Sequence, residues 1–179
     1  SRLSIFDFHT ASHTGKVGTS LCASAIGEIA FSSGQHYWEV YITNLPTSND
    51  DTSKRMYIGI CNVDEVMSTR HYVGEKSNGW GYLSIDGKTV HKQMSKGYGI
   101  KYGRVGDRIG VRLDCDLGQL SFSVNNVDQG VAFDSSSLKN SNLTLCVSLF
   151  CPGQSVSVSK RPYDMENVEF TGLDRLMES

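Results

Sequence analysis

The sequence predicts an all-β domain built as an antiparallel sandwich or barrel. Apolar residues recur at every second position in many short runs, as in half-buried strands, whereas sustained 3.6-residue periodicity is scarce. The 179 residues include 18 glycines, and turn sequences separate the runs at short intervals. A chain of this length suits one domain with a sizeable core.

The expected strands follow from these runs in chain order. They are Glu28–Phe31, His36–Ile42, Met56–Cys61, Gly79–Ile85, Thr89–His91, Arg108–Asp114, Gln119–Val124, Gly130–Phe133, Leu143–Leu149 and Ser155–Ser159. The sequences SSG, NLPTSNDD, IDG, YGRVGD, DLG, NNVD and CPGQ mark the turns between them.

Two hairpins have clear turn signals. The pair Asp86-Gly87 supplies the positive φ angles of a tight turn, so strands should flank it directly. In the second hairpin, Asp114 and Gly118 turn the chain before a strand of alternating residues. Leu120, Phe122 and Val124 are expected to face the core, and Ser121 and Ser123 to face water.

The stretch GQHYWEV, residues 34–40, places a histidine, two aromatics and a carboxylate side by side, which raises the question of a ligand site. Side chains alternate along a strand, so Trp38 and Val40 should point to the core while Glu39 points the other way. A buried tryptophan contributes roughly 3–5 kcal/mol relative to its truncation. We therefore interpret the stretch as scaffold.

Two segments are expected to lie outside the sheets. The polar run Thr43–Lys54 is predicted to be a surface loop. The alternation ends after Ser159, so we predict a domain over residues 1–160 and a return segment with a tail over residues 161–179.

Composition narrows the function classes. The formal net charge of −2 gives no basic stripe for nucleic acid, and no apolar run or leader-like segment indicates a membrane or secretion. The cysteines have no CxxC or zinc spacing and suit a reducing compartment, so we expect a cytoplasmic protein, with a nuclear location left open. No metal and no cofactor are expected.

The order of motifs is more specific than any one of them. GQHYWEV, YIGIC, GWGY, GDRIGVRLDCDLGQLSFSVNN, QGVAF and LCVSLF follow one another from Gly34 to Val158. This succession resembles a SPRY domain, the core of the B30.2 module. The resemblance implies a bent antiparallel β-sandwich of two sheets with concanavalin-like jelly-roll architecture. It also implies a protein-interaction module in a larger adaptor, scaffold or ubiquitin ligase, with strands before Gly34 as an N-terminal extension.

The stretches GWGYLSIDGKTVHKQ and QGVAF look more similar to the SPRY domains of SOCS-box adaptors, an F-box adaptor and Ran-binding scaffold proteins than to tripartite-motif ligases. Three positions depart from the family pattern. Leu145 stands where the family commonly has proline, and Cys151 where SOCS-box adaptors have a binding tryptophan. Their binding tyrosine falls near Thr69, so their peptide specificity should not carry over.

The resemblance implies that loops at one rim bind the partner, and hot spots favour tyrosine, tryptophan and arginine. The run Ser68–Gly74 therefore ranks first, and two further loops should converge with it. The expected contact residues are Lys16, Val17, Thr19, Arg70, His71, Tyr72, Phe150, Cys151 and Pro152. We expect a protein or peptide ligand, no catalytic residue, and a monomer for the isolated domain.

Three other interpretations stay open at this stage. Tyr72 and Phe150 could instead close the end of the core. A lectin would need sugar or calcium ligands, for which Asn49-Asp50-Asp51 is the faint candidate. A cysteine hydrolase would need pairs such as Cys151 with His71 or Cys22 with His36, but nothing in the local sequence defines them. The glycine-rich run Lys96–Gly106 lacks the strand and helix of a phosphate cradle.

Overall fold

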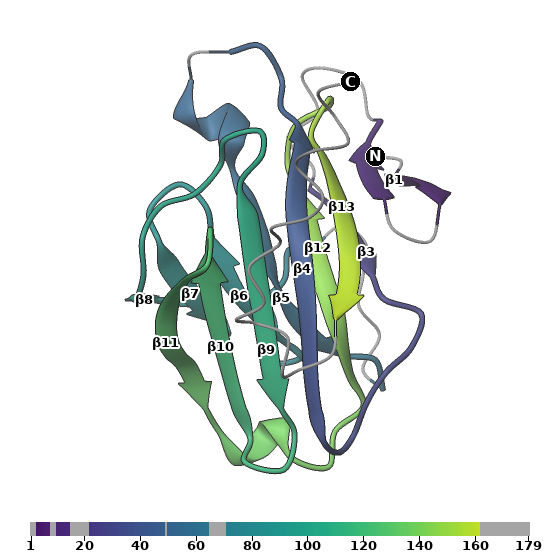
Figure 1. The fold of residues 1–179 in the computed structure, drawn as a ribbon, viewed down its shortest axis with the longest axis vertical. Coiled ribbons are helices and arrows are strands. Elements are labelled where there is room, and N and C mark those ends of the chain that lie inside the picture. The colour runs from purple at the N-terminus through teal and green to yellow at the C-terminus, as the bar shows by residue number, and fades with distance from the viewer. Residues whose placement is uncertain (1–2, 8–9, 15–21, 49, 65–70, 162–179) are drawn as a thin grey trace, which may run out of the picture.

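The computed structural model describes residues 3–7, 10–14, 22–48, 50–64 and 71–161. In this part of the chain the strands form two antiparallel sheets that face each other (Figure 1). Two short 3-10 helices, η1 (Asp51–Lys54) and η2 (Ser136–Leu138), lie at opposite ends of the sandwich. The predicted all-β antiparallel sandwich is confirmed. Within the described ranges, no helix is long and apolar enough to cross a membrane.

The larger sheet has seven strands, and β4 at its centre is the longest of the molecule's described strands. The order in this sheet is β1 (Leu3–Asp7), β2 (Thr10–His13), β13 (Ser155–Arg161), β4 (Gln35–Asn44), β9 (Arg108–Asp114), β10 (Gln119–Val124) and β11 (Val127–Asp134).

The second sheet has six strands. Their order is β3 (Ala23–Ile26), β12 (Leu143–Leu149), β5 (Met56–Asn62), β6 (Gly79–Leu83), β7 (Lys88–His91) and β8 (Met94–Gly97). Each sheet ends on the same side of the sandwich in a strand with only one neighbour, β11 in one sheet and β8 in the other (Figure 1).

The core lies between the sheets and follows the strand alternation. Trp38 and Val40 of β4 meet Ile58 and Ile60 of β5 in one buried cluster, and each such side chain contributes about 1.5–3 kcal/mol by leaving water. The core position predicted for Trp38 is therefore confirmed. Residues 35–40 of GQHYWEV thus belong to β4, the central strand of the seven-stranded sheet.

A second buried cluster covers the outer face of the six-stranded sheet. Tyr57 and Cys61 alternate with the core residues of β5 and therefore point outward. Val73 lies over them, and an added Cβ at Gly81 would come within 2.7 Å of the Val73 carbonyl oxygen. Gly81, the second glycine of GWGYL, thus allows the segment after β5 to cross the sheet at close range.

Most strand predictions agree with the structure, and Arg108–Asp114, Gln119–Val124 and Leu143–Leu149 match at both ends. The strand predicted at Glu28–Phe31 is wrong, because β3 ends at Ile26 and Phe31 forms only an isolated bridge. Between them the Thr144 hydroxyl, rather than a backbone amide, donates to the Ile29 carbonyl (2.8 Å). A side chain therefore replaces the ladder at this point.

The first predicted hairpin also differs in detail. Four residues, 84–87, separate β6 from β7, and only Gly87 has a positive φ (71°). Strand β8 was not predicted, because its residues are all exposed. The turn before it places Lys92 and Gln93 at positive φ (52° and 63°), where glycine or asparagine is the usual signal.

The outer face of β10 is also less wet than expected. Leu120, Phe122 and Val124 are buried as predicted, but Ser123 is buried as well. The Tyr37 phenol of β4 covers it, and an added Cβ at Gly110 would come within 2.8 Å of the Tyr37 hydroxyl. The glycine in RIGV leaves room for this ring.

Three tyrosines connect the core to the segment 98–102. Tyr82 packs against Tyr98 and Tyr102 with ring centroids 5.3 and 5.0 Å apart. The Tyr82 hydroxyl donates to the Ile100 carbonyl, the Tyr102 hydroxyl to the Tyr82 carbonyl (2.6 Å), and the Tyr98 hydroxyl to Gly130 (2.5 Å). Burial raises the pKa of Tyr98 to about 12 and also raises the pKa of Tyr82 and Tyr102.

These pKa values predict a loss of stability in alkali. The folded pKa lies above the unfolded value of about 10, so the unfolded chain releases its tyrosine protons first. The contribution of these tyrosines to stability should be fully present below about pH 10 and should be lost as the pH rises towards about 12. Thermal melts with phenolate absorbance should show phenolate forming together with unfolding. Titration of all phenols near pH 10 in the folded protein would contradict this.

Candidate functional site

The structure brings together two of the three predicted rim segments at the upper end of the sandwich in Figure 1. Tyr72 and Phe150 lie with ring centroids 6.0 Å apart, although 78 positions separate them in the sequence (150 minus 72). Cys151 and Pro152 follow at the same rim and are half-buried. Lys16, Val17, Thr19 and Arg70 lie outside the described residues, so their place in the site stays a prediction.

An aromatic cluster forms at this rim, here called the rim cluster: Tyr57, Tyr72 and Phe150. Tyr57 stacks on Tyr72 with centroids 4.6 Å apart and meets Phe150 at 5.5 Å. Tyr57 is buried, whereas Tyr72 and Phe150 are half-buried and keep part of their surface exposed. The guanidinium carbon of Arg55 lies 5.4 Å from the Phe150 centroid, within the range of a cation–π contact.

Sequence reasoning missed two members of this arrangement, Arg55 and Tyr57. Tyr57 stands at an outward position of MYIGIC and could have been found from the alternation alone. Nothing local indicates Arg55, because its contact with Phe150 depends on how the two loops meet. Its Nε is buried and has no hydrogen-bond partner among the described residues.

The side chain of Gln154, here called the Gln154 clamp, joins the turn after β12 to the residues that enter β5. Its side chain is completely buried, and its Oε1 accepts hydrogen bonds from the backbone amides of Phe150 (2.7 Å) and Cys151 (3.0 Å). Its Nε2 donates to the carbonyls of Ser53 and Arg55, each at 2.9 Å. The turn after β12 is thereby tied to the residues that enter β5, and Phe150 is held beside Arg55.

A pair of buried hydroxyls holds the other segment. The hydroxyl oxygens of Ser24 and Ser148 lie 2.6 Å apart. Ser24 Oγ also donates to the His71 carbonyl (2.8 Å), and Ser148 Oγ accepts from the Val73 amide (2.9 Å). These bonds fix the backbone on both sides of Tyr72 to strands β3 and β12. The exposed edge of Tyr72 is therefore presented by a fixed backbone.

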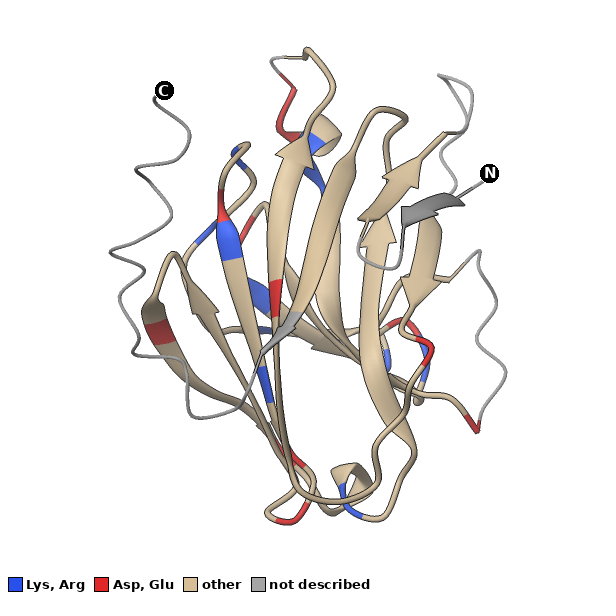
Figure 2. Cartoon of the chain, turned by 45° about the vertical axis from the view of Figure 1, so that its right-hand side comes forward, with Lys and Arg blue, Asp and Glu red and all other residues tan. Residues whose placement is uncertain are grey.

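Charge at the rim is mixed. His71 Nε2 lies 3.8 Å from Glu75 Oε1, and the Tyr72 amide donates to Glu75 Oε2 (3.3 Å). Burial, and then the Glu75 carboxylate, raise the pKa of Tyr72, so its hydroxyl stays a neutral donor at physiological pH. Figure 2 shows acidic and basic residues near one another at this end, not a face of one sign.

The pairs considered for a hydrolase have other contacts. Burial raises the pKa of Cys151, and raises that of Cys22 to about 11, which keeps both thiols protonated near neutral pH. His36 stacks on Phe31 with centroids 3.8 Å apart, and its Nε2 lies 2.8 Å from the Ser33 carbonyl. The His36 ring is thus engaged by Phe31 and by the Ser33 carbonyl.

Described residues of the other candidate clusters have contacts within the fold, whereas Asn49 lies outside the described residues. Glu39 accepts from the hydroxyls of Tyr41 (2.6 Å) and Tyr37 (3.3 Å) and lies 3.5 Å from Arg108 Nη1. Asp50 caps η1 by accepting from the Thr52 amide (2.9 Å). Within the ranges the structure describes, no group of three or more His, Cys, Asp or Glu side chains is arranged to hold a metal.

Comparison with known proteins gives a consistent result. The family model described as SPRY domain matches residues 35–161. F-box/SPRY domain-containing protein 1 of Drosophila ananassae is 35% identical over 130 residues, covering 68% of this chain and 48% of that protein. Its namesake in Anopheles gambiae is 32% identical over 123 residues, covering 64% and 45%. The chain thus spans about half the length of these curated relatives.

Two solved structures share the fold. The crystal structure of the SPRY domain of human HERC1 has a TM-score of 0.70 and 19% identity, covering 87% of this chain and 91% of that one. A crystal structure of a human SPRY domain has a TM-score of 0.69 and 20% identity, covering 94% and 99%. At these identities the likeness shows the fold alone.

The Gln154 clamp predicts a large loss of stability on truncation. Gln154→Ala leaves two amides and two carbonyls without partners, and each buried orphan costs about 1–3 kcal/mol. We expect the free energy of unfolding to fall by about 3–5 kcal/mol in urea titrations. Hydrogen exchange at the Phe150 and Cys151 amides should accelerate as well.

Gln119→Ala is the matched control, because Gln119 donates to Asp134 (3.0 Å) in an exposed position. This change should cost less than about 1 kcal/mol. Equal losses in the two variants would show that the clamp does not hold the rim.

Proposed function

Because this chain belongs to the SPRY domain family, we propose that it is a non-catalytic protein-interaction module that binds a peptide or an exposed loop of a partner protein at the rim. The observation that carries the proposal is the rim cluster, in which the half-buried residues Tyr72 and Phe150 lie on a backbone held by hydrogen bonds. Half-buried aromatics of this kind are typical anchors of protein interfaces.

The geometry suits recognition of a short segment. The backbones that carry Tyr72 and Phe150 are held by buried hydrogen bonds, so the domain loses little conformational entropy when it binds. The exposed parts of Tyr72 and Phe150 would take an apolar side chain, and Arg55 would add a cation beside Phe150. Lys16 and Arg70, if they join this rim, would favour an acidic or carbonyl-rich ligand.

We further propose that the domain is the recognition part of a larger adaptor. The curated relatives that it matches are named F-box/SPRY domain-containing proteins, and the match spans about half of their length. An adaptor of this kind would use the SPRY rim to select a partner protein. The five free thiols suit a reducing compartment, so we place the protein in the cytoplasm or nucleus. The isolated domain is expected to be a monomer.

Selection from a phage-displayed library of random peptides tests the rim. Peptides enriched on the wild-type chain should lose affinity by at least about tenfold on Arg70→Ala with Tyr72→Ala, measured by fluorescence polarisation. Phe150→Ala should have a similar effect. The variants should remain folded in thermal melts, although Tyr72→Ala and Phe150→Ala should lower the melting temperature because they remove the packing contacts with Tyr57.

Leu117→Ala is the matched control. Leu117 is an exposed apolar residue (58%) in the β9–β10 turn at the opposite end of the sandwich (Figure 1). Its truncation should leave peptide affinity unchanged. Undiminished affinity in the rim variants would refute this site, and failure to enrich any peptide would count against peptide recognition altogether.

A further inference from the structure

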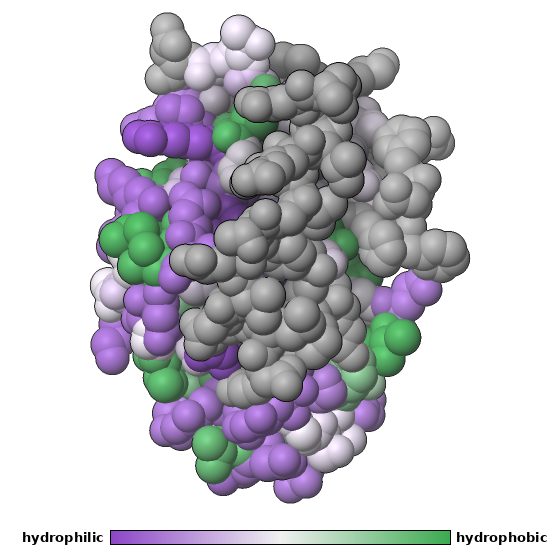
Figure 3. Space-filling view, in the orientation of Figure 1, coloured by the Kyte–Doolittle hydropathy of each residue, from purple (hydrophilic) through white to green (hydrophobic). Residues whose placement is uncertain are grey.

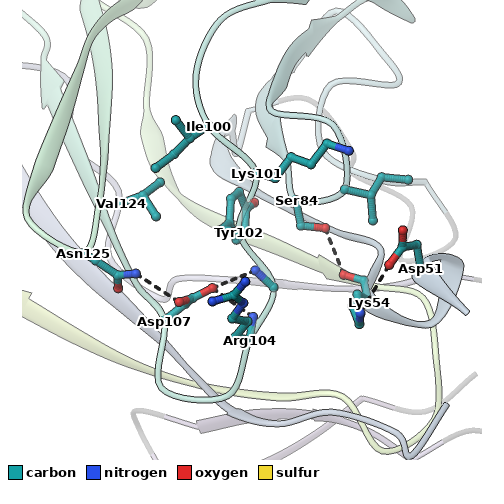
Figure 4. A pocket seen from close by; sticks show the side chains of 12 residues that line it. Asp51, Lys54, Ser84, Ile100, Lys101, Tyr102, Arg104, Asp107, Val124 and Asn125 are labelled. Carbon is teal, nitrogen blue, oxygen red and sulfur yellow. Dashed lines mark hydrogen bonds and ion pairs between the residues drawn. The ribbon is translucent and has the colours of Figure 1, made fainter. Parts of the chain in front are cut away.

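The structure contains a pocket of about 370 Å³, whose lining side chains are shown in Figure 4. It lies between η1, the turn after β6, the segment 100–107 and the end of β10. Lys54 lines the pocket, whereas the next residue, Arg55, lies over Phe150. Ile85 also lines it and packs against the cluster that includes Tyr57. The pocket and the rim cluster are therefore neighbours on one surface.

Hydrogen bonds hold two walls of the pocket together. Ser84 Oγ donates to the Lys54 carbonyl (2.9 Å) and accepts from the Met56 amide (3.0 Å), while the Ser84 carbonyl accepts from the Tyr102 amide (3.1 Å). The Tyr102 hydroxyl is anchored in the core at Tyr82 (2.6 Å). The polar groups of Ser84 and Tyr102 are thus already hydrogen-bonded within the protein and do not require a ligand.

Asp107 fixes the remaining wall. Its Oδ2 accepts from the amides of Gly103 (2.8 Å) and Arg104 (2.9 Å), and its Oδ1 accepts from Asn125 Nδ2 (3.0 Å). Burial raises the pKa of Asp107, but these hydrogen bonds outweigh burial and hold the pKa below its usual value. The carboxylate is occupied by the loop itself, and the pocket is preformed.

The cationic side chains around the pocket are less constrained by ion pairs and hydrogen bonds than Asp107 is. Lys54 meets Asp51 at 3.2 Å, but the two side chains are 40% and 83% exposed, so water and salt weaken this pair. Lys101 has an exposed side chain with no ion pair to the described residues, and Arg104 is also exposed. Three cations against two carboxylates leave a formal charge of +1 on the lining.

Apolar side chains also line the pocket. Ile85 and Val124 line it, and Ile100 at its mouth is 50% exposed. Val105, in the adjoining loop, is 61% exposed. Figure 4 shows Ile100 and Val124 on one side of the pocket and Lys54 and Lys101 on the other. Elsewhere, on the face drawn in Figure 3, hydrophobic residues are scattered among hydrophilic ones.

We propose that this pocket binds a carboxylate side chain and an adjacent apolar side chain of the same partner segment that contacts the rim cluster. This inference rests on the proposed function and specifies its ligand. The carboxylate faces Lys101, Arg104 and Lys54, and the apolar side chain lies against Ile100 and Val124. A segment that crosses the start of β5 reaches the pocket and Phe150 together.

A carboxylate suits the pocket better than a phosphate. Phosphate sites usually present free backbone amides, but the amides of Gly103 and Arg104 already donate to Asp107. Two negative charges would also lie near the carboxylates of Asp51 and Asp107, whereas a single negative charge matches the formal +1 of the lining. A phosphorylated segment is therefore the competing ligand for the experiment to exclude.

The test uses random twelve-residue peptides displayed on phage and selected on the wild-type chain. Enriched peptides should carry Asp or Glu beside Leu, Ile, Val or Met. The double change Lys101→Glu with Arg104→Glu should weaken them by at least about tenfold, and the Glu→Gln form of each peptide should be insensitive to it. Affinity should also fall with added salt.

Lys96→Glu with Lys139→Glu is the matched control, because it changes the net charge equally at exposed sites outside the pocket lining. Affinity should then change less than about twofold. Neutral peptides that need Tyr72 and Phe150 but ignore the Lys101 and Arg104 changes would overturn the inference and leave the proposed function intact. Acidic peptides that ignore Tyr72 and Phe150 would overturn the proposed function. Tighter binding of a phosphoserine form would overturn the carboxylate assignment.

Discussion

The side chain of Gln154 accepts two hydrogen bonds from the turn after β12 and donates two to the residues that enter β5, in a position with no solvent exposure. A buried primary amide is stable only when its donors and acceptor are satisfied, so the two loops can meet in few other ways. Phe150 and Arg55 owe their contact to this arrangement. Arg55 is also the residue next to Lys54, so the clamp sets how the pocket adjoins the rim cluster.

The sandwich and its loops have different roles. Trp38, Val40 and Ile58 lie between the sheets and make the scaffold rigid, while the residues that would meet a partner lie on loops. Those loops are not free, because Ser24 and Ser148 fix one segment, Gln154 a second and Asp107 a third. A surface prepared in this way leaves most of the entropic cost of binding to the ligand.

The sequence predicts the strands well because alternation and turn residues are local signals. Trp38 in the core and the β9–β10 hairpin at Asp114 and Gly118 follow from them. Strand β8 lacks such a signal, since Lys92 and Gln93 occupy the turn. The candidate site is harder to predict. His71, Tyr72 and Phe150–Pro152 were predicted through the motif order, whereas Gln154 and Arg55 act through contacts between residues about a hundred positions apart.

We propose that one preformed rim, from the Tyr72 and Phe150 rings to the Lys101 pocket, recognises the partner. Backbone amide chemical shifts of the labelled chain, followed as a selected peptide is added, test it most directly. We expect shifts confined to Lys54–Tyr57, His71–Glu75, Ile100–Arg104, Val124 and Phe150–Gly153. Shifts centred on the β9–β10 turn around Leu117, or on the β8 and β11 edges, would contradict it.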